Sequence, residues 1–455
     1  MDFPEKFALR MQEILGEEYE SFRAKMEEEN PVKGLRLSKK GQANRARIEE
    51  CYDLKRLSYG RDCYELSAPF DGKHPYHRAG AFYMQDPGAM SAVASASHVI
   101  EKGMRVLDLC AAPGGKTTQL AALVGDDGML YANEITPSRC RILCSNIERL
   151  GLCHTAVTNA SPQDLAKYYD RYFDFVLVDA PCSGEGMLRK SEEARIEWSE
   201  ENVRMCADRQ DTILDEAAKF LRGGGYLLYS TCTFSEEENE GAVLRFLARH
   251  ADFHLCDLAP EVARVTARGR MLEGCEELTK CARFYPHLAN GEGQFAALLR
   301  RDDTAGEGGI LKKDALPSLS KAEEAAVKDF LRDSVGALDA RLVKNGNLVC
   351  AVPHDMPLPA CHLAWVGVPV GELVKGRLVP HHAFFAAYGA LFERKLDLSL
   401  DDARLPAYLH GDTVPAPELS DGFCAVLVDG MALGGGKVVS GVLKNHYPKG
   451  LRSPS

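Results

Sequence analysis

The sequence lacks the features that would assign it to a membrane or secreted class. No run of about 18 apolar residues occurs in its 455 residues, so no membrane-spanning helix is predicted. The opening stretch MDFPEKFALRMQEILGEEYE is polar and amphipathic, and we expect no secretory signal peptide. The 15 cysteines are spread along a chain without such a signal, which favours a cytoplasmic protein with reduced thiols.

Metal-ligand spacing is also missing, because no two cysteines form a Cys-x-x-Cys pair. Cys140, Cys144, Cys153 and His154 lie close together in sequence. However, Cys140 and Cys144 are one helical turn apart in CRILCSNIERLGL, where small buried residues are common. A core helix is the stronger interpretation, and no metal is predicted.

The chain has no overall positive charge, since its formal net charge is −11. The distribution is uneven: residues 33–61 carry nine Lys or Arg against three Asp or Glu. The last twenty residues carry four basic residues and no acid. Each basic segment is consistent with a solvated surface or with contact to RNA phosphates, and the sequence leaves both open.

The arrangement of strand and helix patterns predicts an α/β fold. Phe7, Met11, Ile14 and Leu15 fall at helical spacing and predict an amphipathic first helix. Buried strands then alternate with helices, which indicates a Rossmann-like, doubly wound and mainly parallel sheet. The predicted strands are 105–110, 129–135, 154–160, 173–181 and 224–234, and the predicted helices are 115–124, 137–150 and 204–221.

Changes in composition predict several parts. An α+β N-terminal segment, a candidate for RNA binding through its basic residues, is followed by the sheet domain, which QFAALLRR (294–301) closes. A Gly-rich, charged linker would lead to a helical and mixed domain. The strand-like stretches AVLVDG and KVVSGVLK predict a β-rich C-terminal module. The expected boundaries are 1–75, 76–301, 302–322, 323–395 and 396–455.

The stretch LDLCAAPGGKTT (107–118) ends like a phosphate-binding P-loop. Cys110 occupies the position where that pattern requires its first glycine, and Pro113 removes a backbone donor. Glu134 follows the next strand, about 20 residues on, where an acidic residue can bind a ribose diol. These residues favour a nucleoside without a triphosphate, S-adenosylmethionine, over a triphosphate or a plain structural turn.

Two cysteines lie beyond predicted strand ends. Cys182 follows Asp179 in DAPCSGEGMLRK, and Cys232 lies in STCTFSEEEN. A buried structural role is the ordinary one for a single cysteine. Two thiols at one sheet edge beside a methyl donor suit methylation at C5 of a pyrimidine, because a thiolate that adds to C6 makes C5 nucleophilic.

These three motifs, CAAPGGKT, DAPCSGEG and STCTFSEEEN, together resemble the NOL1/NOP2/Sun family of RNA cytosine-5 methyltransferases. Over nearly the whole chain, including FYMQDPGAM, HGDTVP and LKNHYPKGLR, the sequence is most similar to the bacterial RsmF-type 16S rRNA methyltransferases. The resemblance implies an S-adenosylmethionine cofactor and a C-terminal PUA-like module that binds RNA. It also implies 16S rRNA or the small ribosomal subunit as partner, with no membrane contact and no stable protein partner.

The resemblance also assigns roles to individual residues. It implies that Cys232 attacks C6, that Cys182 assists product release, and that Asp179 lies beside the base and the donor. The implied cofactor residues are Cys110, Ala111, Ala112, Pro113, Gly114, Gly115, Lys116, Glu134 and Asp179. Lys190 would contact substrate phosphate or remain a solvated surface lysine.

At one position the chain departs from the family pattern. Relatives often place an Asp after the third strand, near the adenine, where this chain has Asn159 and Ser161, either of which could hydrogen-bond the adenine. The motifs do not separate 16S rRNA from tRNA or 23S rRNA. A non-catalytic ribosome-assembly protein is a further alternative, against which the two edge thiols and Glu134 count.

Overall fold

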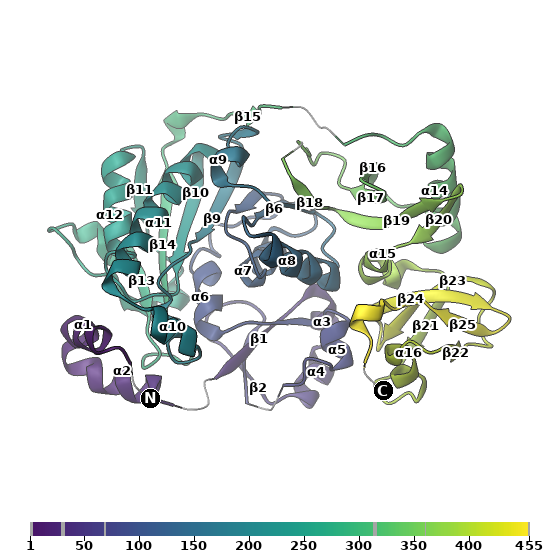
Figure 1. Ribbon diagram of the computed structural model, residues 1–455, viewed down its shortest axis with the longest axis horizontal. Helices are drawn as coiled ribbons and strands as arrows, with labels where there is room; N and C mark the ends of the chain where they lie inside the picture. Colours follow the sequence, from purple (N-terminus) through teal and green to yellow (C-terminus); the bar gives the residue numbers. More distant parts are fainter. Residues whose placement is uncertain (1–2, 29–31, 68–69, 313–315, 360, 454–455) are drawn as a thin grey trace.

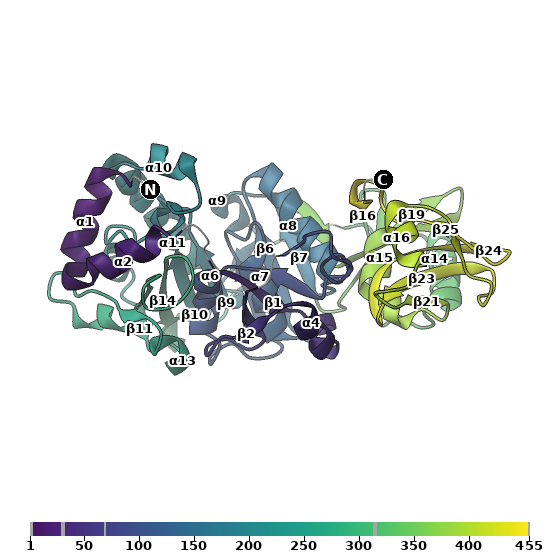
Figure 2. The same cartoon turned by 90° about the horizontal axis from the view of Figure 1, so that it is seen from below.

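The computed structural model describes residues 3–28, 32–67, 70–312, 316–359 and 361–453. The molecule is elongated, with the N-terminal helices at one end, a large sheet in the middle and the β-rich C-terminal part at the other end (Figure 1, Figure 2). Within the described residues, no helix is both long enough and apolar enough to cross a bilayer.

Two N-terminal helices, α1 (Glu5–Leu15) and α2 (Tyr19–Met26), pack on the central part. Phe7 and Met11 are only 2% and 1% exposed, which confirms the amphipathic helix that their spacing predicts. Both belong to a buried cluster with Trp198 and Phe234, residues that are distant in sequence. The apolar face of α1 therefore anchors the N-terminus beside the strand end that carries Cys232.

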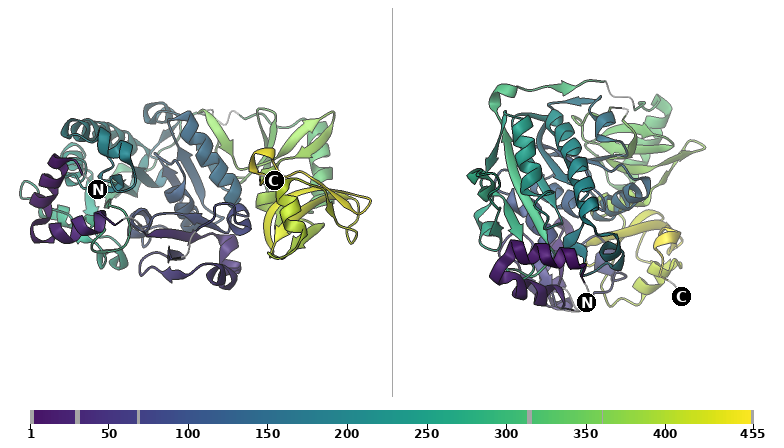
Figure 3. Two further views of the ribbon diagram at one scale, coloured as in Figure 1. Left: turned by 60° about the horizontal axis from the view of Figure 1, so that its bottom comes forward. Right: turned by 60° about the vertical axis from the view of Figure 1, so that its left-hand side comes forward.

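A small antiparallel sheet in the order β2-β3-β1-β4 follows these helices. Its apolar residues Leu35 and Phe82 share one buried cluster with Leu396 and Val426 of the C-terminal part. Figure 3 (left) shows the two parts lying side by side. The elements are β1 (Lys33–Leu37), α3 (Lys39–Ala43), α4 (Arg45–Cys51), β2 (Leu54–Arg56), β3 (Cys63–Leu66), α5 (Pro75–Arg78) and β4 (Phe82–Met84).

The central sheet has the order β12-β13-β14-β10-β9-β5-β6-β7-β18, with β11 paired to β14. Its middle strands are parallel, as predicted. These strands are β5 (Arg105–Asp108), β6 (Met129–Asn133), β7 (Thr155–Thr158), β9 (Phe173–Asp179) and β10 (Leu221–Thr231). Each of these strands ends two or three residues before its predicted end, because those residues turn into the loops at the sheet edge, and β10 begins three residues before its predicted start.

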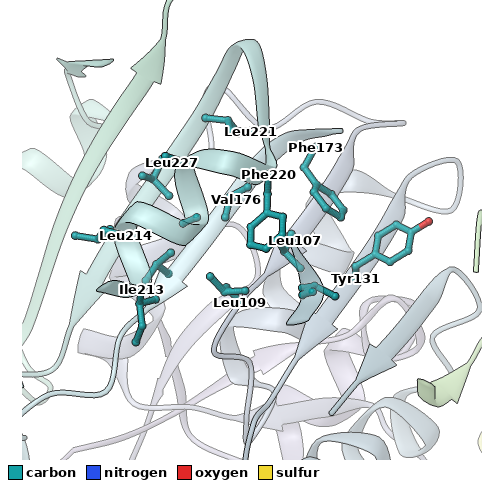
Figure 4. Close-up of a cluster of buried hydrophobic side chains, with 14 of the residues drawn as sticks. Leu107, Leu109, Tyr131, Phe173, Val176, Ile213, Leu214, Phe220, Leu221 and Leu227 are labelled. Atoms are coloured by element: carbon teal, nitrogen blue, oxygen red, sulfur yellow. The ribbon is translucent and has the colours of Figure 1, made fainter. Parts of the chain in front are cut away.

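Helices cover both faces of this sheet, which confirms the doubly wound α/β fold. Along each strand, successive side chains point to opposite faces. Leu107 and Val176 therefore pack under α11 (Figure 4), whereas Val106 and Phe175 pack under α6 and α7. The helices are α6 (Pro87–Ser95), α7 (Gly115–Val124), α8 (Pro137–Leu150), α9 (Pro162–Leu165), α10 (Glu192–Glu197), α11 (Glu200–Phe220), α12 (Glu240–Arg249) and α13 (Pro260–Ala263).

Antiparallel strands extend both edges of the parallel core. One edge is formed by β11 (Phe253–Cys256), β12 (Ala267–Arg268), β13 (Ala282–Phe284) and β14 (Gln294–Arg301). At the other edge, β18 (Leu363–Val366) pairs with β7. The segment expected as a separate first C-terminal domain, 323–395, thus contributes a strand to the central sheet. In the expected linker, β15 (Gly309–Ile310) pairs with β8 (Tyr169–Asp170).

The C-terminal part contains two further sheets. The first has the order β16-β17-β19-β20 and the second β21-β23-β24-β25-β22. The predicted single strand KVVSGVLK is wrong, because Ser440 and Gly441 both have positive φ and turn the chain between β24 and β25. The elements are α14 (Lys321–Ser334), β16 (Arg341–Asn345), β17 (Leu348–Val352), β19 (Val368–Val374), β20 (Arg377–Pro380), α15 (His382–Tyr388), β21 (Lys395–Leu398), α16 (Arg404–His410), β22 (Val414–Pro415), β23 (Gly422–Val428), β24 (Met431–Val439) and β25 (Val442–Asn445).

Candidate active site

The motifs singled out from the sequence meet at one edge of the central sheet. β5, β9 and β10 are parallel neighbours, so their carboxyl ends lie together. Cys110 follows β5, Asp179 is the last residue of β9, and Cys232 comes directly after β10. Ligands bind at this edge in open α/β sheets. The fold therefore places the predicted cofactor loop beside the predicted thiols.

The thiols of Cys182 and Cys232 form a close pair. Their Sγ atoms are 3.3 Å apart, within hydrogen-bonding range for sulfur, and both cysteines are free. The Cys182 hydrogen bond lowers the pKa of Cys232, against burial, which raises it. The same hydrogen bond raises the pKa of Cys182 well above its usual range. Cys232 is therefore the member of the pair that loses its proton more readily.

A cation beside the pair favours the same assignment. Lys116 Nζ donates to Asp179 Oδ2 at 2.8 Å; the Asp179 carboxylate raises the pKa of Cys232, and the positive charge of Lys116 lowers it. Burial lowers the pKa of Lys116, but the Asp179 carboxylate outweighs that effect and the pKa is raised. The ammonium group thus stays charged. Because Lys116 is engaged with Asp179, it is not free to hold phosphates, which argues against the P-loop alternative.

Two buried glutamates, called here the carboxylate clamps, hold the thiol loops against each other. Glu238, which follows β10, accepts hydrogen bonds from the backbone N–H of Ser183 at 2.9 Å and from the Ser183 hydroxyl. It also accepts one from Gln210 Nε2 at 2.9 Å, and Gln210 donates to the carbonyl of Pro181 as well. A residue after β10 therefore fixes the loop that carries Cys182. Burial raises the pKa of Glu238 to about 7.

The second clamp, Glu185, lies in the loop that carries Cys182 and binds residues that follow Cys232. Glu185, from the Cys182 loop, accepts hydrogen bonds from the Thr233 hydroxyl and the Phe234 N–H, each at 2.9 Å. Trp198 Nε1 donates to its other oxygen at 2.9 Å. Sequence reasoning missed both glutamates, since an acidic run such as SEEENE is normally a solvated surface. Glu185 and Glu238 are buried only because the two loops pack against each other in the folded structure.

The cofactor loop between β5 and α7 is tightly held by backbone geometry and side chains. Gly114 has φ of 111°, a conformation that glycine adopts readily. Arg139 Nη2 donates to the Ala112 carbonyl at 2.7 Å, and Asn146 Nδ2 to that of Pro113 at 2.9 Å. Thr117 Oγ1 donates to the buried Asp108 carboxylate at 2.7 Å. Burial raises the pKa of Cys110, so its thiol stays neutral.

Glu134 lies next to this loop, immediately after β6. Its side chain is only 3% exposed, accepts a hydrogen bond from the Thr136 N–H at 2.8 Å, and lies 3.5 Å from Arg139. A fixed carboxylate offers acceptors to a ribose diol, and Lys116 lies at the opposite end of the loop near the thiols. A buried carboxylate beside a glycine turn at the sheet edge fits the nucleoside cofactor predicted from the sequence, S-adenosylmethionine.

Asn159 and Ser161, the residues that depart from the family pattern, form hydrogen bonds with backbone groups in this structure. Asn159 Nδ2 donates to the carbonyls of Glu134 and Ile135 at 2.5 and 3.0 Å. Ser161 caps α9, where its hydroxyl accepts from the Asp164 N–H at 3.1 Å. An adenine contact through either residue stays a prediction.

Lys190 is neither free nor merely solvated. Its Nζ lies 3.0 Å from Glu292 and 3.5 Å from Asp86, so two carboxylates already neutralise it. Its expected contact with substrate phosphate stays a prediction, and one that would require exchange of these partners.

The two basic segments differ in what their charges contact. In 33–61, Arg36 and Lys40 are internal, and five further cations form ion pairs, so seven of the nine are engaged within the protein. Lys437 and Lys444 face each other across β24 and β25 and are exposed. Neither forms an ion pair within the described part of the chain, and Lys437 Nζ lies 5.5 Å from the ring centroid of Phe423. The five ion-paired cations are Lys39, Arg45, Arg47, Lys55 and Arg61.

Cys140 and Cys144 lie on α8, as the core-helix interpretation requires, and Cys140 is buried with Leu143 and Ile147. Among the residues that the structure describes, no three His, Cys, Asp or Glu side chains gather in a group that could hold a metal ion.

Comparison with known proteins gives the same family over three parts of the chain. A family model described as 16S rRNA methyltransferase RsmB/F matches residues 99–300. Models for the N-terminal domain of 16S rRNA methyltransferase RsmF and for the methyltransferase RsmF PUA domain match residues 3–87 and 395–453. The last match confirms the predicted PUA-like module.

Individual relatives of the chain carry the same family name. The chain is 31% identical over 394 residues to ribosomal RNA small subunit methyltransferase F of Aeromonas salmonicida, and 33% identical over 393 residues to that of Klebsiella pneumoniae. Each alignment covers 84% of this chain and 80% of the relative. A methyltransferase homolog protein from Pyrococcus horikoshii has 26% identity and a TM-score of 0.56, over 66% of this chain and 95% of that one. The chain therefore belongs to the RsmB/F family of S-adenosylmethionine-dependent 16S rRNA methyltransferases, most similar to RsmF, and its resemblance to the NOL1/NOP2/Sun family is confirmed.

Proposed function

We propose that this enzyme methylates C5 of a cytosine in 16S rRNA through a covalent bond between Cys232 and C6 of the base. The observation that carries this proposal is the thiol pair, 3.3 Å apart, beside the cofactor loop. Transfer to oxygen or nitrogen needs no thiol nucleophile, whereas C5 of cytosine is unreactive until a nucleophile adds to C6. The names of the relatives support 16S rRNA as the substrate, ahead of tRNA or 23S rRNA.

The geometry suggests a division of labour between the thiols. Cys232, as thiolate, forms the bond to C6, and the electron pair displaced from the C5–C6 double bond makes C5 nucleophilic. Bound S-adenosylmethionine supplies an electrophilic methyl group at that carbon. Removal of the C5 proton then restores the double bond and expels Cys232. Once Cys232 has reacted, the Cys182 thiol has lost its hydrogen-bond acceptor; after it gives its proton to solvent, its thiolate can take the C5 proton and so assist this elimination.

The remaining site residues position the reactants in this proposal. Residues 110–116 and Glu134 hold the cofactor. Asp179, fixed by Lys116 at 2.8 Å, lies where it can accept hydrogen bonds from the cytosine amino group and from the donor. A base within a duplex cannot present C6 to a thiol, so the target is unpaired or flipped out.

Other expectations complete the proposal. A reactive pair of free thiols needs a reducing compartment, which supports a cytoplasmic location. The domain boundaries predicted from the sequence remain part of the proposal, with the contribution of β18 to the central sheet as a refinement. The exposed lysines of the C-terminal module are the strongest candidates for RNA contact.

Two cysteine variants test the chemistry. Cys232→Ser should abolish methylation, and bisulfite sequencing of 16S rRNA that still shows 5-methylcytosine would refute the role of Cys232. Cys182→Ala should permit attack but stall elimination, so a protein–RNA adduct should accumulate on a denaturing gel. Cys206→Ala, on the same domain but in α11, is the matched control and should behave like wild type. Absence of the adduct in Cys182→Ala would show that the two thiols do not divide the work in this way.

Incubation with labelled S-adenosylmethionine separates the remaining alternatives. Transfer of label to 30S subunits or 16S rRNA supports the proposal. Transfer to tRNA or 23S rRNA alone would change the substrate. No transfer to any RNA would favour a non-catalytic assembly protein.

A further inference from the structure

A buried arginine of the N-terminal segment reaches the helix that closes the cofactor loop. Arg36 lies in β1 and is only 4% exposed. Within the described residues it forms no ion pair, and burial lowers its pKa to about 10, so the guanidinium remains charged at neutral pH. A buried charge without a carboxylate is costly, and it needs several hydrogen bonds to be tolerated.

These hydrogen bonds go to the first turn of α7. Arg36 Nη2 donates to the Gly115 carbonyl at 3.2 Å and to the Thr118 hydroxyl, and Nη1 donates to the Thr118 carbonyl at 3.2 Å. Gly115 is the last glycine of the cofactor loop and the first residue of α7. The guanidinium therefore binds the helix at the point where the loop ends.

Tyr83 in β4 and Gln85 directly after it, next to β1 in the same small sheet, reinforce this contact. Arg36 Nε donates to Gln85 Oε1 at 3.3 Å, and Gln85 Nε2 donates to Gln119 Oε1 at 3.4 Å. Tyr83 OH donates to the Pro113 carbonyl at 3.4 Å, and a Cβ on Gly115 would lie 3.3 Å from the Tyr83 ring. The β1–β4 side of the small sheet thus packs against the cofactor loop and the start of α7.

We propose that Arg36 is a positioning residue for S-adenosylmethionine, which it never touches, and that the N-terminal segment completes the cofactor site. Without the guanidinium, Gln85 loses a partner and the first turn of α7 loses three hydrogen bonds to a rigid group. The loop then samples more conformations, and ordering it costs part of the binding free energy. This inference depends on the cofactor of the family and not on the proposed cytosine chemistry.

Cofactor affinity, measured without RNA, tests the proposal. In isothermal titration of the full chain with S-adenosylmethionine, Arg36→Met should raise Kd about tenfold. Arg36→Lys keeps the charge but has a single ammonium group in place of the forked guanidinium, so its Kd should lie between the values for wild type and Arg36→Met. In steady-state assays KM for the cofactor should rise with Kd, whereas kcat should change less than about threefold.

The matched control is Arg301→Met at the opposite edge of the same domain. Arg301 also donates to two backbone carbonyls, those of Ala218 and Leu221, and pairs with Asp252. Its loss should destabilise the fold without changing Kd. Hydrogen exchange gives a second readout: residues 109–118 should exchange faster in Arg36→Met and Arg36→Lys but not in Arg301→Met.

Three outcomes would overturn the proposal. These are a Kd for Arg36→Met within twofold of wild type, an equal rise in Kd for Arg301→Met, or unchanged exchange at residues 109–118 in both Arg36 variants. If Arg36→Met does not fold, Kd and exchange in Arg36→Lys decide between the same results. Because RNA is absent from these measurements, failure of the proposed cytosine chemistry would leave them unchanged.

Discussion

Replacement of Glu238 by Gln should remove a pH dependence of folding stability that the thiol loops impose. Burial raises the pKa of this carboxyl from its ordinary 4.5 to about 7. The native state therefore holds this proton up to a higher pH than the unfolded chain does. The stability linked to Glu238 is fully present below pH 4.5 and is lost as pH rises through 7.

The size of the effect follows from the two pKa values. One unit corresponds to about 1.4 kcal/mol, so the full difference contributes about 3 kcal/mol, of which about 2.5 kcal/mol is lost between pH 5 and 8. Glutamine can keep the geometry, since its oxygen can accept from Ser183 and Gln210 and its amide can donate to the Ser183 hydroxyl. It does not titrate. Wild type should thus lose about 2.5 kcal/mol relative to Glu238→Gln between pH 5 and 8.

Urea unfolding from pH 5 to 8 measures this difference. Tryptophan fluorescence is a suitable signal, because Trp198 donates to the neighbouring clamp Glu185. Glu201→Gln, which alters an exposed acid on α11, is the control and should follow wild type at every pH. If wild type and Glu238→Gln keep a constant difference in stability across this range, Glu238 does not titrate as a buried clamp and the reasoning is refuted.

Two further predictions concern the cation beside the thiols and the C-terminal lysines. Lys116→Met should raise the pKa of Cys232 and slow alkylation of its thiol by iodoacetamide at pH 7 about tenfold, a rate measured by mass spectrometry of the Cys232 peptide. An unchanged rate would show that Lys116 does not activate this thiol. The double variant Lys437→Gln/Lys444→Gln should bind 16S rRNA more weakly and reduce the slope of log affinity against log salt by about 1 to 2. The ion-paired Lys39→Gln is its control, and an unchanged slope in the double variant would remove the β24–β25 face from the RNA interface.

Much of the active site could be predicted because local sequence patterns report chemistry at strand ends. Strand, glycine turn and helix in succession imply the cofactor loop, and parallel strands bring Cys182 and Cys232 to the same edge. The comparisons confirm the fold, the family and the cofactor. The roles of the individual cysteines stay predictions, which the variants above test.

Long-range contacts were harder to predict. The basic segment 33–61 looks like an RNA-binding surface in sequence, but charge patterning does not show which cations meet a carboxylate from elsewhere. Arg47 pairs with Asp429, almost four hundred residues away in sequence, and Arg36 turns inward to α7. Similarly, nothing in the sequence around β18 shows that it pairs with β7, because edge pairing depends on which strand is left uncovered.

The sequence by itself determined the order of strands and helices, the thiol and loop motifs and the family, since these depend on residues adjacent along the chain. Only the tertiary structure decided which charges are buried. Glu238 and Arg36 are polar residues that sequence patterning places at the surface, yet each is enclosed and satisfied by partners from another segment. Hydrogen bonds between distant segments offset the loss of hydration, and such partners exist only once the chain has folded.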